Sequence, residues 1–163
     1  MMKLQKSNRE EIIMNLFNDD VVSEYKKWKD ANPDNFSWWN FVNMKADLDT
    51  ALAFAKFYCP EIIEIEGCCF LKDKYNSTIY ESWKQECNGD KKQLEMMANI
   101  YRICDFFEIN ETDNEIEKIE VLGNILKYFW TTTFKSMYPE KNLKVEIFEE
   151  QDKELFITVY SEQ

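Results

Sequence analysis

The chain of 163 residues carries 31 aspartates and glutamates against 20 lysines and arginines, which gives a formal net charge of −11, and it contains no histidine. The charge argues against direct nucleic-acid binding, which needs a basic surface. The missing histidine removes the commonest group for proton transfer near neutral pH and the commonest metal ligand. Aromatic residues make up 15% of the chain, enough to build a core, so we expect one globular domain over residues 1–163.

Helical spacing of apolar residues predicts three helices before Pro60, over about residues 8–18, 21–31 and 48–58. Ser7 and Glu10 have the spacing of a capping box at the start of the first helix, and Asp47 is placed to cap the third. Ser37 begins a short aromatic segment between the second helix and the third.

The pattern changes after Pro60 to short apolar runs. Residues 62–65 are rich in β-branched side chains, and a second apolar run follows Gly67 at residues 68–71. Such runs, separated by a glycine, predict a short pair of strands with a bend or bulge at the glycine.

Two further helices are predicted after this strand pair. Asn76 or Ser77 is expected to cap the first of them. Asp90 is expected to cap the second, whose apolar residues continue in phase to about Phe107.

The last part of the chain combines a long helix with two alternating segments. Thr112 and Glu115 have the spacing of a capping box, which opens the longest predicted helix, ending near Met137. Residues 143–147 and 155–159 alternate between apolar and polar side chains, which is typical of a hairpin. Together the elements predict an α+β fold, mainly helical, with a short mid-chain strand pair and a C-terminal β-hairpin.

Few residues in the sequence suggest catalysis. The three glycines are isolated, which excludes glycine-rich phosphate-binding loops, and no cofactor or metal is expected, because zinc sites need closely spaced cysteine and histidine pairs. The carboxylates of Glu61, Glu64 and Glu66 are the remaining candidates, since a cluster of carboxylates can act as acid and base or bind a hard cation. Strand alternation also explains them as a row that faces solvent.

The five cysteines are an odd number without a C-x-x-C pair. In a reducing compartment such cysteines are expected to be buried, unreactive side chains. The sequence has no apolar run long enough to cross a membrane and no secretory signal, so we expect a cytoplasmic protein.

Two acidic groups in the second half of the chain are candidate partner-binding residues. They comprise Glu108, Glu111, Asp113 and Glu117 around the start of the longest helix, and Glu149, Glu150 and Asp152 in the hairpin loop. Two such patches could steer a basic protein partner toward the chain. The alternative is a solvated surface, because acidic residues at a helix start favour the helix dipole and acidic faces aid solubility.

Trp38 and Trp39 are adjacent, so a regular element cannot direct both side chains inward. Tryptophan is enriched among the residues that contribute most to protein–protein binding. One of the two is therefore a candidate exposed anchor for a partner.

Three stretches of the chain resemble a set of small uncharacterised bacterial proteins: residues 53–67, residues 99–107, and the segment from Phe129-Trp130 through Tyr138-Pro139 to the final hairpin. These proteins are similar to the small acidic immunity proteins that neutralise bacterial toxins. The resemblance implies a non-enzymatic protein that occludes the active site of a basic toxin or nuclease domain. The alternatives are an enzyme centred on the three glutamates and a small-molecule sensor with an aromatic-lined cavity.

Overall fold

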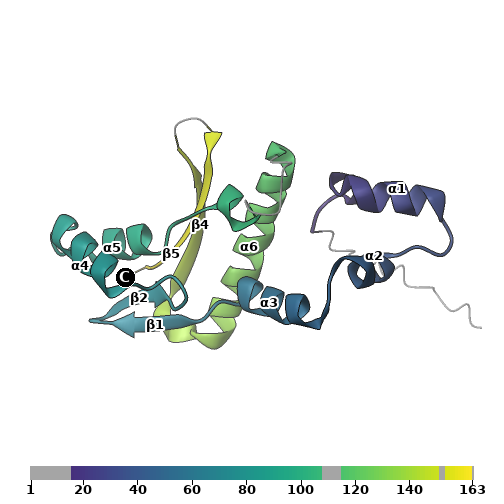
Figure 1. Ribbon diagram of the computed structural model, residues 1–163. Helices are drawn as coiled ribbons and strands as arrows, with labels where there is room; N and C mark the ends of the chain where they lie inside the picture. Colours follow the sequence, from purple (N-terminus) through teal and green to yellow (C-terminus); the bar gives the residue numbers. More distant parts are fainter. Residues whose placement is uncertain (1–15, 108–114, 151–152, 163) are drawn as a thin grey trace, which may run out of the picture.

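Two small antiparallel sheets and six helices make up the residues that the computed structural model describes, which are 16–107, 115–150 and 153–162 (Figure 1). The helices are α1 (Ser23–Ala31), α2 (Trp38–Lys45), α3 (Leu48–Tyr58), α4 (Ser77–Glu86), α5 (Lys91–Ala98) and α6 (Ile116–Met137). The strands are β1 (Ile62–Ile65), β2 (Cys68–Leu71), β3 (Tyr101–Arg102), β4 (Leu143–Glu149) and β5 (Leu155–Ser161). Short 3₁₀ segments are η1 (Asp19–Val21), η2 (Ile103–Phe107) and η3 (Pro139–Lys141). The expected α+β class, mid-chain strand pair and C-terminal hairpin are confirmed. Three residues of the expected capping boxes, Ser7, Glu10 and Thr112, lie outside the described residues.

Strands β1 and β2 form a tight hairpin, in which Ile63 lies opposite Phe70. Glu66 and Gly67, the two residues between the strands, both have positive φ, at 53° and 76°. Two consecutive residues in the left-handed region are typical of a type I′ turn, whose twist matches that of the paired strands. The bend predicted at Gly67 is therefore a two-residue hairpin turn.

The second sheet has the strand order β3-β5-β4, so the last strand in the chain lies in the middle. Alternate residues of β4 and β5 face α6, including Val145 and its cross-strand partner Val159. They pack there with Leu126, Trp130 and Phe134 of α6, each at most 2% exposed. This contact is the main hydrophobic core of the protein.

Helix α6 is the longest described helix, at 22 residues. It lies close to η2 at Gly123, where an added β-carbon would come within 2.7 Å of Cδ1 of Ile103. Within the described part of the chain, neither α6 nor any other helix combines the length and the apolar character needed to cross a membrane.

Helix α5 ends before Asn99, and the predicted continuation of this helix to Phe107 is wrong. The Asn99 side chain is buried between β2 and β5. It accepts a hydrogen bond from the N–H of Leu71 at 2.8 Å and donates to the carbonyl oxygens of Cys69 and Val159, both at 2.9 Å. The helix stops here because these bonds bind its end to two strands that lie far away in the sequence; β3 and η2 follow.

Glu95, one helical turn before Asn99, is also fully buried. Its carboxylate accepts hydrogen bonds from the backbone N–H of Cys69 at 2.7 Å and from the backbone N–H of Ser161 at 2.6 Å. On the same face of the sheet, the hydroxyl of Thr158 donates to the carbonyl of Met96 at 2.7 Å. Helix α5 therefore joins the two sheets through side chains, by satisfying backbone groups of β2 and β5.

The chain before α3 packs around a separate aromatic cluster. Trp38 stacks on Tyr25 with 3.8 Å between the ring centroids, and Phe36 and Phe41 also contact the Tyr25 ring. Ser37 caps α2, a regular helix where we expected only a short aromatic segment. Figure 1 shows α1 and α2 beside α3, on the side away from the sheets.

Candidate functional site

Two acidic groups that are far apart in the sequence lie at one end of the molecule. Helix α6 begins at this end and β4 finishes there, because the helix and the strand pack against each other in opposite directions (Figure 1). We call this surface the acidic end and define it by four exposed carboxylates: Glu117, Glu120, Glu149 and Glu150. None of the four makes a salt bridge with a described residue.

The structure places three of the seven acidic residues that the sequence singles out, Glu117, Glu149 and Glu150, and it brings all three to the acidic end. The other four lie outside the described residues: Glu108, Glu111, Asp113 and Asp152. Glu120 joins the surface because it follows Glu117 by one helical turn.

Arg102 lies near the acidic end but does not neutralise its charge, because this arginine is already paired with two other carboxylates. Arg102 lies 2.6 Å from Asp105 and 2.8 Å from Glu154. The hydrogen bonds to Asp105 and then to Glu154 raise the pKa of the Arg102 guanidinium. Lys153 is exposed in the hairpin turn. Lys118 of α6 lies 3.6 Å from Glu115. Among the described residues, the four carboxylates of the acidic end therefore outnumber the lysines beside them and leave the surface negative.

Trp38 and Trp39 have different environments. Trp38 belongs to the aromatic cluster, and its indole N–H donates to the Asp19 carboxylate at 3.0 Å. Trp39 is 76% exposed. Trp39 is therefore the exposed tryptophan of the pair, and its position on α2 keeps it apart from the sheet and the hairpin (Figure 1).

A groove of about 480 Å³ runs between α1 and α2 beside Trp39. Its apolar walls are Trp28, Phe36, Trp39 and Met44, and its polar residues are Asn32, Asn35, Asn40 and Asn43. The lining contains no charged side chain, so this groove differs in chemistry from the acidic end.

The three glutamates of the mid-chain segment each have their own cationic partner. Glu61 contacts Lys56 and lies 2.6 Å from Lys72; these lysines lower its pKa to about 2. Glu64 pairs with Lys141, and Glu66 lies 2.6 Å from Lys84. The pKa values of Glu64 and Glu66 are also lowered, chiefly by hydrogen bonds from these lysines. A general acid at neutral pH needs a raised pKa, so the contacts favour an ion-paired surface.

Within the described residues, no three acidic or cysteine side chains are grouped in a way that could ligate a metal.

All five cysteines are free thiols, and three of them, Cys68, Cys69 and Cys87, are buried as expected. Burial raises the pKa of Cys69 to about 11 and also raises that of Cys68. Cys59 is exposed at the end of α3, so the expectation of burial is wrong for it. The helix ends there, and Cys59 lies on the solvent side with Leu48, Leu52 and Ala55.

An apolar hollow of about 330 Å³ lies between α3 and η2. We call it the phenylalanine hollow; its lining residues are Thr50, Ala53, Phe54, Phe57, Phe106 and Phe107. A second hollow of about 280 Å³ adjoins it and shares Ala53, Phe57 and Phe106. Local sequence patterns do not reveal this hollow, because it joins residues of two segments that are about fifty positions apart.

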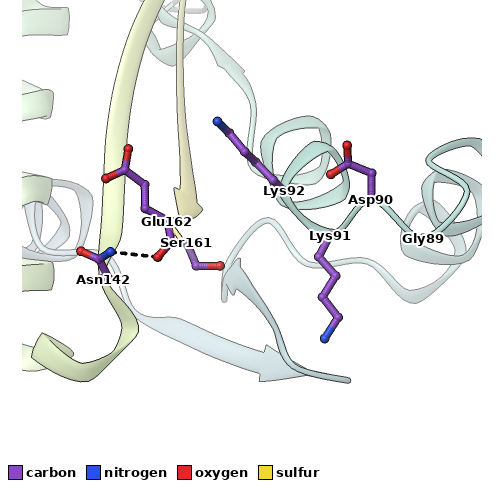
Figure 2. Close-up of a pocket in the computed structure, with 7 residues that line it drawn as sticks. All are labelled: Gly89, Asp90, Lys91, Lys92, Asn142, Ser161 and Glu162. Carbon is purple, nitrogen blue, oxygen red and sulfur yellow. Dashed lines mark hydrogen bonds between the residues drawn. The ribbon is translucent and has the colours of Figure 1, made fainter.

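Another hollow, of about 800 Å³, is open and polar (Figure 2). Its lining residues are Gly89, Asp90, Lys91, Lys92, Asn142, Ser161 and Glu162. Figure 2 shows the side chains of Lys91 and Lys92 extending in different directions, so they do not converge on one ligand. Asp90 already caps the start of α5, and Asn142 donates to the Glu162 carbonyl at 2.8 Å.

No family model, curated protein or solved structure matches the chain.

Proposed function

We propose that this chain is a non-enzymatic binding protein, an immunity or inhibitor protein that occludes the active site of a basic toxin or nuclease domain. The observation that carries the proposal is the acidic end, where exposed carboxylates of α6 and β4 lie together without cationic partners among the described residues. These carboxylates would occupy the lysines and arginines with which such a domain binds the phosphates of its substrate. We also propose that the protein acts in the cytoplasm, where a reducing environment keeps its five cysteines as thiols.

Among the properties of the complex, the rate of association with the basic partner should respond most strongly to the charge of the acidic end. Helix α6 and strand β4 both pack into the main core, so the backbone that carries Glu117, Glu120 and Glu149 is held in regular structure. A cluster of like charges steers an oppositely charged partner and raises the association rate by about 10–10³ at low salt. At ~1 M salt the screening length falls to about 3 Å, and this gain is lost.

The test uses as partner a basic protein encoded beside this chain, because immunity proteins are encoded next to their toxins. Association is measured by stopped flow or surface plasmon resonance at low and high salt. The test variant reverses Glu117, Glu149 and Glu150 to lysine. The matched control reverses three exposed glutamates away from the acidic end, Glu81, Glu86 and Glu140, and produces the same change in net charge.

We expect the acidic-end variant to associate at least about tenfold more slowly at low salt, and the control to stay close to the wild-type rate. The partner's own activity should be inhibited by the wild-type chain and by the control. Equal slowing in both variants would show that only net charge matters and would reject the acidic end as the binding surface. Absence of a complex with any basic neighbour would reject the proposed function.

A further inference from the structure

Helix α3 carries apolar residues on two opposite faces. One face packs inward, where Phe57 lies 5.0 Å from Phe106 between ring centroids. The opposite face is exposed, and we call it the α3 stripe; it is defined by Leu48, Leu52, Ala55 and Cys59. Leu48 is 82% exposed and Leu52 is 68% exposed. A helix that is apolar on all sides is normally covered on all sides, so the α3 stripe indicates a surface that a partner covers.

The spacing of the α3 stripe is that of a helix–helix seam. Its four members follow one another at intervals of four, three and four residues. This pattern repeats every 3.5 residues on average, as the apolar positions of paired helices do. The spacing therefore favours a second helix as the occupant.

The sizes of the four side chains favour the same stripe of a second copy. The two leucines lie in the first half of the stripe, and the two small residues lie in the second half. If two copies of α3 pack antiparallel, Leu48 faces Cys59 of the second copy and Leu52 faces Ala55 of the second copy. Each large side chain then meets a small one, which allows close packing along the whole seam. A parallel pair would place leucine against leucine and alanine against alanine.

The charges beside the stripe are also complementary to those of a second copy. Asp49 and Lys56 are seven residues apart and flank the same side of the stripe. In the antiparallel pair, Asp49 lies within about 3 Å along the helix axis of Lys56 of the second copy, and the two-fold axis repeats this pair.

Both charged groups are available for such a pair. Asp49 is exposed and has no cationic partner among the described residues. The Lys56 side chain is 68% exposed and contacts Glu61, which Lys72 also holds at 2.6 Å. Lys56 can therefore turn toward the second copy without leaving Glu61 unpaired.

We propose that the α3 stripe packs against the same stripe of a second copy of this chain, in a two-fold symmetric homodimer with antiparallel α3 helices. This inference concerns self-association and is independent of the proposed function. Helix α3 has 11 residues, so the interface is smaller than the roughly 1,200 Å² of a stable complex. We expect a dissociation constant of about 10–100 µM, which leaves the chain monomeric at low micromolar concentration.

The first test measures the mass of the full chain by sedimentation, in the presence of a reductant, from about 5 µM to about 1 mM. The mass should rise from 19.7 kDa toward twice that value. Leu52→Glu should weaken the dimer by about tenfold or more, because it places a charge in the seam. The matched control is Ile79→Glu, which makes the same change in charge at an exposed apolar residue of α4 and should leave the dimer intact.

The second test exchanges the flanking charges. Asp49→Lys leaves only lysines beside the seam, and Lys56→Glu leaves only carboxylates. Each variant alone should dimerise more weakly than the wild type by about fivefold or more, because like charges then face each other twice. A mixture of the two variants should form a heterodimer, which sedimentation with one variant fluorescently labelled detects.

The third test determines the orientation of the helices by cross-linking. Cys59 of one copy faces position 48 of the other, so Leu48→Cys should give a disulfide-linked dimer when oxidised glutathione accepts the electrons and protons of the thiols. The same two positions within one chain are about 16 Å apart along the helix and cannot bridge. The wild type should give no such dimer, because its two Cys59 thiols are also about 16 Å apart. Adding Cys59→Ser to Leu48→Cys should abolish the link.

The opposite results would overturn the proposal. A wild-type mass that stays at 19.7 kDa up to about 1 mM would show that the α3 stripe does not bind a second copy. Equal weakening by Leu52→Glu and Ile79→Glu would place the contact elsewhere. A disulfide between the two Cys59 thiols of the wild type, or a link that survives Cys59→Ser, would indicate a parallel pair. None of these measurements uses a basic partner, so they leave the proposed function untouched.

Discussion

The buried carboxylate of Glu95 binds Ser161 twice, by accepting the backbone N–H at 2.6 Å and the hydroxyl at 2.7 Å. The other oxygen of the carboxylate accepts the N–H of Cys69 at 2.7 Å. Glu95 and Asn99 thus satisfy backbone groups of β2 and β5, which are not paired with each other. Glu95 tolerates little change, because a buried donor without an acceptor is costly.

Glu95→Gln is expected to lower the free energy of unfolding by about 2–3 kcal/mol, because the new amide NH₂ must face backbone N–H groups that it cannot accept from. Urea denaturation at neutral pH measures the loss. Glu86→Gln, at an exposed position of α4, serves as the control and should change stability by less than about 0.5 kcal/mol. A loss below 1 kcal/mol at Glu95 would contradict the assigned role.

Glu61 should make stability depend on pH in the acid range. Its hydrogen bonds with Lys56 and Lys72 lower its pKa from 4.5 to about 2 in the folded chain. A carboxyl with a depressed pKa stabilises the fold above its unfolded value, and the contribution disappears as pH falls from 4.5 toward 2. Glu61→Gln should therefore be less stable than the wild type at pH 7 and equal to it near pH 2, as judged by urea midpoints. A difference that stays constant across this range would contradict the assignment.

Substitution of Trp38 is expected to change amide exchange in α1 and α2, whereas substitution of Trp39 is not. Trp38→Ala removes the ring that stacks on Tyr25 and should increase amide exchange throughout α1 and α2, since this cluster is separate from the main core. Trp39→Ala should leave the exchange pattern unchanged and remove a large part of the acrylamide-quenchable fluorescence, because Trp39 is 76% exposed. Equal exchange in both variants would show that the cluster does not depend on Trp38.

Thiol labelling should distinguish the cysteines by exposure. Cys59 is exposed and is expected to react first with a disulfide reagent at pH 8, in the native state. Cys104 is half-buried with a raised pKa, and Cys69 is buried with a pKa of about 11, so both should react more slowly. Cys59→Ser should eliminate the fast phase. A fast phase that survives this substitution would mean that a buried thiol becomes accessible in the native ensemble.

Charge reversal around the start of α6 should affect binding and not folding. Changing Glu108, Glu111 and Glu117 to lysine is expected to leave the thermal midpoint nearly unchanged, because Glu117 is exposed and an exposed charge contributes about 0–1 kcal/mol. The same variant should associate with a basic partner at least about tenfold more slowly at low salt. An unchanged association rate would indicate that this stretch is only a solvated surface.

Local signals in the sequence predict the elements whose ends depend on nearby residues. Asp47 and Asn76 cap α3 and α4 as expected, and alternation predicts β4 and β5. The end of α5 could not be predicted in this way, because nothing near Asn99 breaks a helix. Its side chain instead binds strands that are tens of residues away, including Val159.

The candidate site also has features that local sequence patterns predict and features that depend on residues far apart in the chain. The acidic residues are visible in the sequence, but whether the described ones have ion-pair partners depends on where the lysines and arginines of other elements lie. Arg102 is an example, since it pairs with Glu154 across β3 and β5. The phenylalanine hollow requires Phe54 and Phe107 to meet, and no local pattern connects them.

Strand β5 follows every other described element in the chain, yet it lies between β3 and β4 and is bridged to β2 by α5. During synthesis on the ribosome, the edges of β3 and β4 that pair with β5 therefore stay unpaired until residues 155–161 emerge. Exposed strand edges and apolar helix faces are the surfaces through which nascent chains associate wrongly. Closure by such late, long-range pairing is also slow. The nascent chain is thus most vulnerable to aggregation in the interval before these seven residues become available.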